Sequence, residues 1–374
     1  PAWRSVKYFL LAFILVSALF GSLTFLVLDP LTLLYRTFAT VLWPAFNALL
    51  LAAEHALYWL PFLQAPIDAL ESTRGAWLSL EPPVYAGAVL AALLFAGVLA
   101  LNAVRPRFWC RYLCPLGGML GLVSRFAWLR RTVSSECVAC QRCVRACPTG
   151  TIDPARGYAS DPAECTMCLD CLPACARGGQ TFIGHLRPAP RQPYDLSRRR
   201  FLGAAAAAIA AIGVFAVEPA ARRAQARLIR PPGAQSPQFA AQCIRCGLCI
   251  KACPTSGLQL SLSEGGTGAT WTPVLVPRLG YCDYTCNACG QVCPTGAIPP
   301  LALAEKRQAV MGHAYIDRSR CLPWADNITC LVCEEMCPLP DKAIKLEDIT
   351  VAGLDGTPIA VRRPHVQHDR CVGC

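Results

Sequence analysis

The chain has 374 residues, enough for two or three domains, and 54% of them are hydrophobic whereas only 16% are charged. This balance is too apolar for an ordinary soluble protein, so part of the chain is expected in lipid. The 35 basic and 24 acidic residues leave a net charge of +11, which membrane-topology signals explain without a nucleic-acid partner. The chain starts at Pro1 and stops inside a cysteine motif at Cys374, so we interpret it as a fragment cut at both ends.

Residues 1–104 are expected to form a membrane region. Tyr8 to Leu28 and Val84 to Val104 are each 21 residues without a charge, and about 20 helical residues cross the hydrocarbon. Both stretches are therefore predicted to span. Thr37 to Ala53 is also uncharged but shorter, and it contains Pro44, so we expect an interfacial or re-entrant helix there.

Basic residues predict the orientation of these spans, because cytoplasmic flanks carry the excess of lysine and arginine. Arg4 and Lys7 precede the first span, and six arginines without an acidic residue follow the second. The side of the membrane that carries residues 105–200 is thus expected to be cytoplasmic. The six arginines are Arg105, Arg107, Arg111, Arg125, Arg130 and Arg131.

Two cysteines, Cys110 and Cys114, lie just after the second span, and Pro115 follows them. A pair of thiols cannot complete an iron-sulfur cluster alone. Three interpretations stay open for them: ligands shared with cysteines outside this sequence, a redox dithiol, or small buried side chains.

Residues 105–190 contain two cysteine motifs with identical spacing. Two-residue gaps let three thiolates wrap a cuboidal 4Fe-4S cluster, and the cysteine after a three-residue gap reaches the other cluster. Disulfides and four-thiolate zinc sites compete with this interpretation, but neither explains a spacing that repeats. The ligand set of one cluster is then Cys137, Cys140, Cys143 and Cys175, and that of the other is Cys165, Cys168, Cys171 and Cys147.

Residues 191–230 are expected to form a signal or anchor helix. Ser197 to Leu202 contains three consecutive arginines, and a weakly hydrophobic run from Phe201 to Val217 follows, as in a twin-arginine export signal. An ordinary membrane helix with arginines on its inner side is the alternative and leads to the same topology. Ala224 to Ala226 offers a cleavage site, so the sequence leaves open whether the following domain stays attached.

Residues 231–374 form a second array of four cysteine motifs, the last incomplete, and this array is expected outside the cytoplasm. Four motifs predict up to four clusters here, and so about six 4Fe-4S clusters in the intact protein. The cysteines of the array are Cys243, Cys246, Cys249, Cys253, Cys282, Cys286, Cys289, Cys293, Cys321, Cys330, Cys333, Cys337, Cys371 and Cys374.

The predicted fold class is α+β, with transmembrane helices and two ferredoxin-like cluster arrays. We expect β-hairpins at Thr151 to Asp153 and at Gly296 to Ile298, each following a Cys-Pro turn. The sequence contains no nucleotide-binding loop, nucleophile elbow or catalytic triad spacing. It therefore predicts an electron carrier rather than a site of organic chemistry, although a quinol-oxidising role stays open.

The motifs carry a family resemblance. The first half, with its spans, Cys110–Cys114 pair and paired cluster motifs, resembles NapH-type and NosR-type membrane ferredoxins. Residues 197 to 374, with the arginine signal, the run Cys243 to Cys249 and the run Cys330 to Pro338, resemble NapG-type and MauM-type proteins. The resemblance implies a relay in the inner membrane of a bacterium, from the quinone pool to a periplasmic oxidoreductase, including the molybdenum class, or a cytochrome. A maturation factor for an exported metalloenzyme is the alternative.

The resemblance also implies how the last four motifs share ligands: the first with the fourth and the second with the third. Cys253 then joins Cys371 and Cys374. The second and third motifs exchange their last cysteines, so that Cys337 joins Cys282, Cys286 and Cys289, whereas Cys293 joins Cys321, Cys330 and Cys333.

Overall fold

The computed structural model describes residues 2–74, 83–186, 197–217, 228–262, 264–352 and 357–374. The chain divides into two compact units, each described here by itself. The first unit takes in residues 1–37, 89–218 and 244–246, and the second takes in residues 38–88, 219–243 and 247–374. Helices and short antiparallel sheets occur together, which confirms the α+β content.

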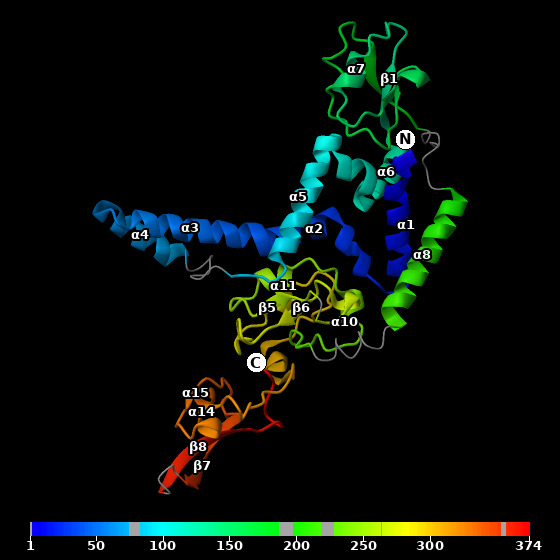
Figure 1. Cartoon of the computed structure of the whole chain (residues 1–374). Helices are drawn as coiled ribbons and strands as arrows, with labels where there is room; N and C mark the ends of the chain where they lie inside the picture. The colour runs from blue at the N-terminus through cyan, green and yellow to red at the C-terminus, as the bar shows by residue number, and fades with distance from the viewer. Residues whose placement is uncertain (1, 75–82, 187–196, 218–227, 263, 353–356) are drawn as a thin grey trace. The chain divides into compact units, whose positions relative to one another are not determined.

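Three helices of the first unit pack side by side, with α1 (Ser5–Leu19) between α6 (Pro115–Val123) and α8 (Arg198–Val217) (Figure 1). Glycine permits the close approach of α6 to α1, because a Cβ at Gly118 would lie 3.1 Å from the Lys7 carbonyl oxygen. Further helices of the unit are α2 (Pro30–Thr37), α5 (Ala88–Val104, shared with the second unit at its first residue) and α7 (Arg142–Ala146).

The helix expected from Tyr8 to Leu28 is shorter than predicted. Its 15 residues end at Leu19, where the chain turns through Gly21 with φ of 80°. Only glycine adopts this left-handed conformation without steric cost, so the helix cannot continue past it. The helix predicted from Val84 to Val104 likewise begins later, at Ala88.

The segment predicted to be a short interfacial helix lies within a longer one. Among the described residues, Pro30–Leu57 is the one helix long and apolar enough to cross a membrane, with 28 residues. It consists of α2, a π-helical segment (Phe38–Leu42) and α3 (Trp43–Leu57). The wide π turn stands directly before Pro44, whose missing N–H would interrupt a regular helix.

Residues 129–184 of the first unit, here called the first module, form two small antiparallel sheets. Strand β1 (Leu129–Val133) pairs with β4 (Gln180–Gly184), which joins the two ends of the module. Strands β2 (Ile152–Asp153) and β3 (Ala159–Ser160) form the hairpin between the two cysteine motifs. The hairpin expected at Thr151 to Asp153 is thereby confirmed.

A buried ion pair holds the first module against α1. Lys7 Nζ lies 2.6 Å from Glu164 Oε1, and the two side chains are 2% and 3% exposed. Nearby, the Arg4 guanidinium donates hydrogen bonds to the carbonyl oxygens of Thr149 and Gly150. Glu164 directly precedes Cys165, and Thr149 and Gly150 closely follow Cys147. The cysteine loops themselves are therefore held against the N-terminal segment.

The second unit contains the third module (residues 321–374) and the second module (residues 239–298), apart from residues 244–246, which belong to the first unit. Strands β5 (Leu258–Leu260) and β6 (Pro273–Leu275) pair in the second module, and β7 (Ile344–Ala352) and β8 (Pro358–Val366) in the third. Ile250, Leu260 and Ile298 are buried in the core of the second module. The helices are α4 (Pro61–Arg74), α10 (Phe239–Gln242), α11 (Leu248–Lys251), α12 (Ala288–Gln291), α13 (Leu303–Gln308), α14 (Leu322–Ala325) and α15 (Val332–Glu335).

The hairpin expected at Gly296 to Ile298 was wrong. The backbone N–H of Ile298 donates to the Cys293 sulfur at 3.4 Å instead of to a strand. Pro299 and Pro300 follow and have no N–H to offer a partner strand, so the segment cannot continue as a ladder. The proposed cleavage site at Ala224 to Ala226 lies outside the described residues.

The ion pair allows a test of how the first module is attached. Glu164→Gln leaves the Lys7 ammonium buried without its countercharge, which costs about 3–5 kcal/mol. We expect a clearly lowered unfolding temperature of the purified full-length chain.

The control is Asp153→Asn, which removes the exposed pair with Arg156 and is expected to cost less than about 1 kcal/mol. Replacing both buried charges by Lys7→Met and Glu164→Leu should restore most of the loss. Equal unfolding temperatures for Glu164→Gln and Asp153→Asn would refute the docking role of the pair.

Candidate metal centres

All 24 cysteines lie in the described part of the chain, and each is a free thiol. Disulfide bonds therefore do not organise the modules. Most of the sulfurs line hollows or join small cores, and only Cys110, Cys140 and Cys168 are exposed.

Hollow A of the first module has four thiols in its wall. Three come from one motif, and the fourth, Cys175, comes from the end of the other. The Tyr158 hydroxyl donates to the Ala139 carbonyl at 3.0 Å and so ties the cysteine loop to the hairpin. The lining cysteines are Cys137, Cys140, Cys143 and Cys175.

Hollow B of the first module has the complementary set. Its wall carries the three cysteines of the second motif together with Cys147 from the first. Its wall also includes Arg131 of β1 and Phe182 of β4, two strands that pair with each other. The lining cysteines are Cys147, Cys165, Cys168 and Cys171, so the structure gathers the two groups that the crossing rule predicts.

The cysteine loops share a strained backbone. In the first motif, Ala139 and Gln141 have φ of 54° and 57°, and in the second motif Met167 and Leu169 have φ of 50° and 65°. Arg245, Gly247 and Gly373 have left-handed φ at corresponding positions of later motifs. A non-glycine residue held there costs about 1–2 kcal/mol, and successive turned N–H groups form concave sites for anions. The loops thus have the shape that an anionic cluster needs.

Cys147 shows how such a thiolate is stabilised. Burial alone would raise the pKa of the Cys147 thiol, but the Thr149 hydroxyl and the N–H groups of Thr151, Thr149 and Gly150 overcome this effect and lower it. Hydrogen bonds to the charged form favour the thiolate, which is the form that binds iron.

A threonine two residues after the cysteine recurs in these turns, and the sequence interpretation did not use it. The sulfur–hydroxyl distances are 3.5 Å for Cys147 and Thr149, and 3.5 Å for Cys253 and Thr255. The third Cys-Pro-Thr turn has Thr295 at 3.8 Å from Cys293. The Cys-Pro-Thr triplet, which occurs three times in the sequence, could have indicated that these threonine hydroxyls lie beside the cysteine sulfurs.

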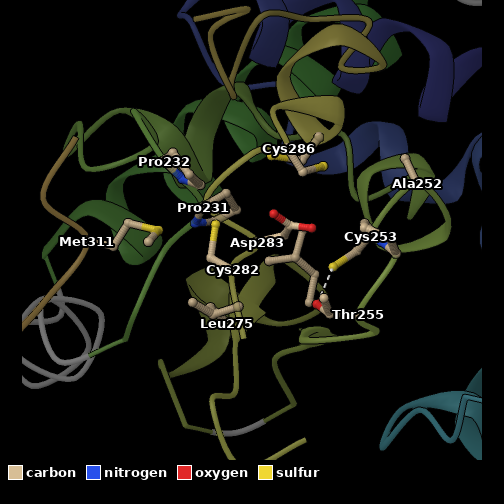
Figure 2. Close-up of a pocket in the computed structure, with 13 residues that line it drawn as sticks. Pro231, Pro232, Ala252, Cys253, Thr255, Leu275, Cys282, Asp283, Cys286 and Met311 are labelled. Atoms are coloured by element: carbon tan, nitrogen blue, oxygen red, sulfur yellow. Dashed lines mark hydrogen bonds between the residues drawn. The ribbon is translucent and has the colours of Figure 1, made fainter. Parts of the chain in front are cut away.

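Hollow C of the second module gathers Cys253 with Cys282, Cys286 and Cys289. Figure 2 shows the sulfurs of Cys253 and Cys282 turned towards the space between them. Burial, and then the charge of neighbouring thiolates, raises the pKa of the Cys289 thiol to about 12. If these buried thiols ionised without a cation nearby, the resulting thiolates would repel one another. Bound iron compensates their negative charges and so removes the electrostatic cost.

Hollow C corrects the pairing that the family resemblance implied. Cys253, and not Cys337, stands with the three cysteines of the second motif. Cys337 instead packs with Cys371 in a separate small core. Burial and then the charge of Cys337 raise the pKa of the Cys374 thiol, which places these two close together. In each of these two modules, the last cysteine of one motif therefore lies with cysteines of the next motif.

A hairpin between the motifs explains this pairing. Strands β5 and β6 fold back antiparallel, which returns the chain from Cys253 to Cys282. Strands β7 and β8 do the same between Cys337 and Cys371, with Ile344 opposite Val366. The third motif keeps its own three thiols together, since burial raises the pKa of the Cys333 thiol and the charges of Cys321 and Cys330 add to the rise.

The remaining cysteines differ in their surroundings. Cys243 and Cys293 pack against the core of the second module that contains Cys249, whereas Cys246 is partly exposed. Cys114 is buried at the start of α6, and its sulfur accepts a hydrogen bond from the Gly117 N–H at 3.1 Å. Burial raises the pKa of the Cys114 thiol, which disfavours the thiolate there.

Each of hollows A, B and C offers four sulfur donors and a concave wall, and this donor set suits a 4Fe-4S cluster. Within the described residues, no three His, Cys, Asp or Glu side chains form a group that could hold a single metal ion. The residues present therefore fit a cluster held by thiolates.

Comparison with protein families agrees with this geometry. The model of a 4Fe-4S dicluster domain matches residues 242–297, and two models of 4Fe-4S binding domains match residues 88–135 and 132–153. The dicluster match covers the two motifs that share hollow C. The match to residues 88–135 includes Cys110 and Cys114. These matches define the chain as a ferredoxin-type iron-sulfur electron-transfer protein.

Curated relatives are similar to about half of the chain. The methylamine utilization ferredoxin-type protein MauM of Methylorubrum extorquens is 36% identical over 195 residues, which are 49% of this chain and 83% of that protein. The ferredoxin-type protein NapG of Escherichia coli is 36% identical over 186 residues, 47% of this chain and 78% of NapG. The chain belongs to this family of MauM and NapG ferredoxin-type proteins. No solved structure matches the chain.

A pair of glycines permits a test of hollow C. A Cβ at Gly280 would lie 2.1 Å from the Thr255 carbonyl oxygen, so Gly280→Ala must push apart the segments that carry Cys253 and Cys282. We expect iron and sulfide content to fall by about one cluster per chain. Gly312→Ala is the control, because its Cβ meets its nearest neighbour at 3.8 Å. Full iron content in Gly280→Ala would contradict the assignment of hollow C.

Proposed function

We propose that this ferredoxin-type protein is bound to the inner membrane of a bacterium and relays electrons from quinol to an oxidoreductase or cytochrome outside the cytoplasm. One observation carries the proposal: hollows A, B and C each unite three thiols of one motif with a fourth from its neighbour. When bound, a 4Fe-4S cluster supplies a couple that takes up and releases one electron.

We assign the ligands by this crossing rule. The cysteines around hollows A, B and C hold three clusters, and Cys243, Cys246, Cys249 and Cys293 hold the second cluster of the second module. Cys337 joins Cys371 and Cys374, while Cys321, Cys330 and Cys333 supply the remaining set. This assignment keeps the expected total of about six clusters.

Apolar helices support the membrane part of the proposal. The large side chains of α5 are exposed along its length, with Val89, Leu93 and Leu99 at 71%, 65% and 55%. Leu49 of α3 is 73% exposed. A helix that presents apolar side chains on several faces suits lipid as its solvent.

The first and second modules are also anchored to apolar helices, each contact lying within one unit. Lys7 and Arg4 attach the first module to α1. In the second unit, the Lys251 ammonium lies 3.8 Å from the centre of the Trp43 ring, at the start of α3. Cation–π contacts of this kind contribute about 0.5–2 kcal/mol, and here they hold a cysteine loop beside an apolar helix.

Export of the last two modules is supported by α8. The triple arginine begins this helix, and the weakly hydrophobic part that follows, residues 201–217, has 17 residues and is about 26 Å long, as a weakly hydrophobic export signal would be. Clusters are inserted in the reducing cytoplasm, so a twin-arginine route that moves folded proteins suits this cargo. We therefore propose that residues 105–200 lie in the cytoplasm and residues 231–374 in the periplasm.

The electrons and protons of quinol oxidation are all accounted for in this proposal. Oxidation of one quinol to quinone yields two electrons and two protons. The electrons go singly to two thiolate-held sites, and the protons go to water. The hydrocarbon layer between the two aqueous sides is about 30 Å thick, which is too far for a single electron-transfer step. Quinol is soluble in this layer and is therefore suited to supply electrons to sites on both sides.

The test of this relay is stepwise reduction of the full-length protein in membranes, first by a quinol analogue and then by dithionite. Electron paramagnetic resonance with iron and sulfide counts is expected to find about six 4Fe-4S centres, some of them reduced by quinol. Membranes stripped of quinone and given no quinol analogue are the control. Unchanged reduction there would overturn the quinol step, and zinc in place of iron would overturn the clusters. A client enzyme that stays active after the chain is removed would favour a maturation factor.

The crossing rule is tested by comparing single ligand variants. Cys175→Ala should abolish the same signal as Cys137→Ala, because both line hollow A, and should leave the signal that Cys165→Ala removes. Matching losses for Cys175→Ala and Cys165→Ala would instead mean that each motif keeps its own four cysteines. Arg156→Gln, at an exposed site of the module, is the control and should keep both signals.

A further inference from the structure

A buried arginine lines hollow B, and neither of its side-chain hydrogen bonds goes to a carboxylate. Arg131 of β1 is 7% exposed. Its Nε donates to Gln180 Oε1 at 3.0 Å and its Nη1 to the Tyr158 carbonyl at 2.6 Å. Neither acceptor is charged, and Nη2 is buried with no hydrogen-bond acceptor among the described residues. Arginine is a permanent cation in proteins, so a positive charge lies inside the module.

A buried cation is costly unless a negative charge compensates it. Arg131 lines hollow B together with Cys165 and Cys171. Burial raises the pKa of both thiols, and the positive charge of Arg131 opposes that rise in each. The thiolates of hollow B are therefore the countercharge that this arginine faces.

The second module also has a buried cation beside a cysteine, here a lysine, and the Asp283 carboxylate in the wall of hollow C interacts with its charge. Lys306 of α13 is 4% exposed, and its ammonium donates to the Asp283 carbonyl oxygen, next to Cys282. Burial raises the pKa of the Cys282 thiol, and Lys306 opposes the rise by its charge and a hydrogen bond. Cys282 lines hollow C, which is built, like hollow B, around the second motif of its module.

Hollow A differs in this respect. The charged side chains in its wall, Glu136 and Arg177, are exposed and opposite in sign. Water and salt screen exposed charges, whereas a buried charge acts through a low dielectric. Arg131 itself lines hollow B and not hollow A, although its two hydrogen-bond acceptors, Gln180 and Tyr158, lie in the wall of hollow A.

We propose that Arg131 and Lys306 raise the reduction potential of the 4Fe-4S sites in hollows B and C, so that in the first module the site in hollow B is reduced before the site in hollow A. The inference rests on the proposed function. Reduction adds one negative charge to an already anionic site, and a fixed buried cation stabilises that extra charge. In the first module, electrons then collect at hollow B, whose loops dock on α1 through Lys7 and Arg4.

The test is a redox titration of the full-length protein in membranes, followed by electron paramagnetic resonance. Arg131→Gln removes the charge and keeps a hydrogen-bonding side chain, whereas Arg131→Lys keeps the charge. We expect the hollow B signal, assigned as the one that Cys175→Ala retains, to shift to lower potential in Arg131→Gln. Arg131→Lys should move it much less.

Arg130→Gln is the matched control. Arg130 is the neighbouring residue of β1, and its guanidinium donates to the carbonyl oxygens of Ala127 and Arg125 instead of lining a hollow. It should leave both potentials unchanged. A merely structural role of Arg131 would lower the cluster content or the unfolding temperature without moving the potential of the clusters that remain.

Two outcomes overturn the inference: an unchanged potential in Arg131→Gln with both clusters present, or an equal shift in Arg131→Lys. If Arg131→Gln fails to retain its clusters, Lys306→Gln carries the same test in the second module, with Arg307→Gln as its control. Absence of clusters from the unmodified protein would refute the proposed function itself, so the two failures are distinguishable.

Discussion

The fold of each cysteine module depends on one antiparallel hairpin between its two motifs. Three different hairpins serve this purpose: β2 with β3, β5 with β6, and β7 with β8. Each returns the chain so that the last cysteine of one motif lies near the first cysteines of the next. A two-stranded hairpin alone is marginally stable in water, so the ligands and the hairpin must stabilise one another.

Charges fix the modules more firmly than their small cores do. The buried Lys7–Glu164 pair and the Arg4 hydrogen bonds attach one module to α1, and Lys251 on Trp43 attaches another to α3. Small domains bury too little apolar surface for strong stability. Specific polar contacts beside the cysteine loops therefore contribute to the attachment of these two modules.

Cysteine spacing was sufficient to predict the sets around hollows A and B, because ligand crossing is encoded in two- and three-residue gaps. The family resemblance, and not the spacing, led to the wrong partners for Cys253, whose position depends on the β5–β6 hairpin that was not recognised in the sequence. Gly21 and Pro299 show a second limit: single residues end a helix or forbid a strand within otherwise favourable patterns. The positions of Arg131 and Lys306 beside cysteines could not be predicted from the sequence, because burial beside a thiol is a property of tertiary structure.

The interleaved arrangement also constrains the order of events during synthesis. Hollow A needs Cys175, the last cysteine of its module, and hollow B needs Cys171. Neither site is complete until almost the whole module has left the ribosome, and both become complete within four residues of each other. A site with all four thiols is therefore available only when the synthesis of the module is nearly complete.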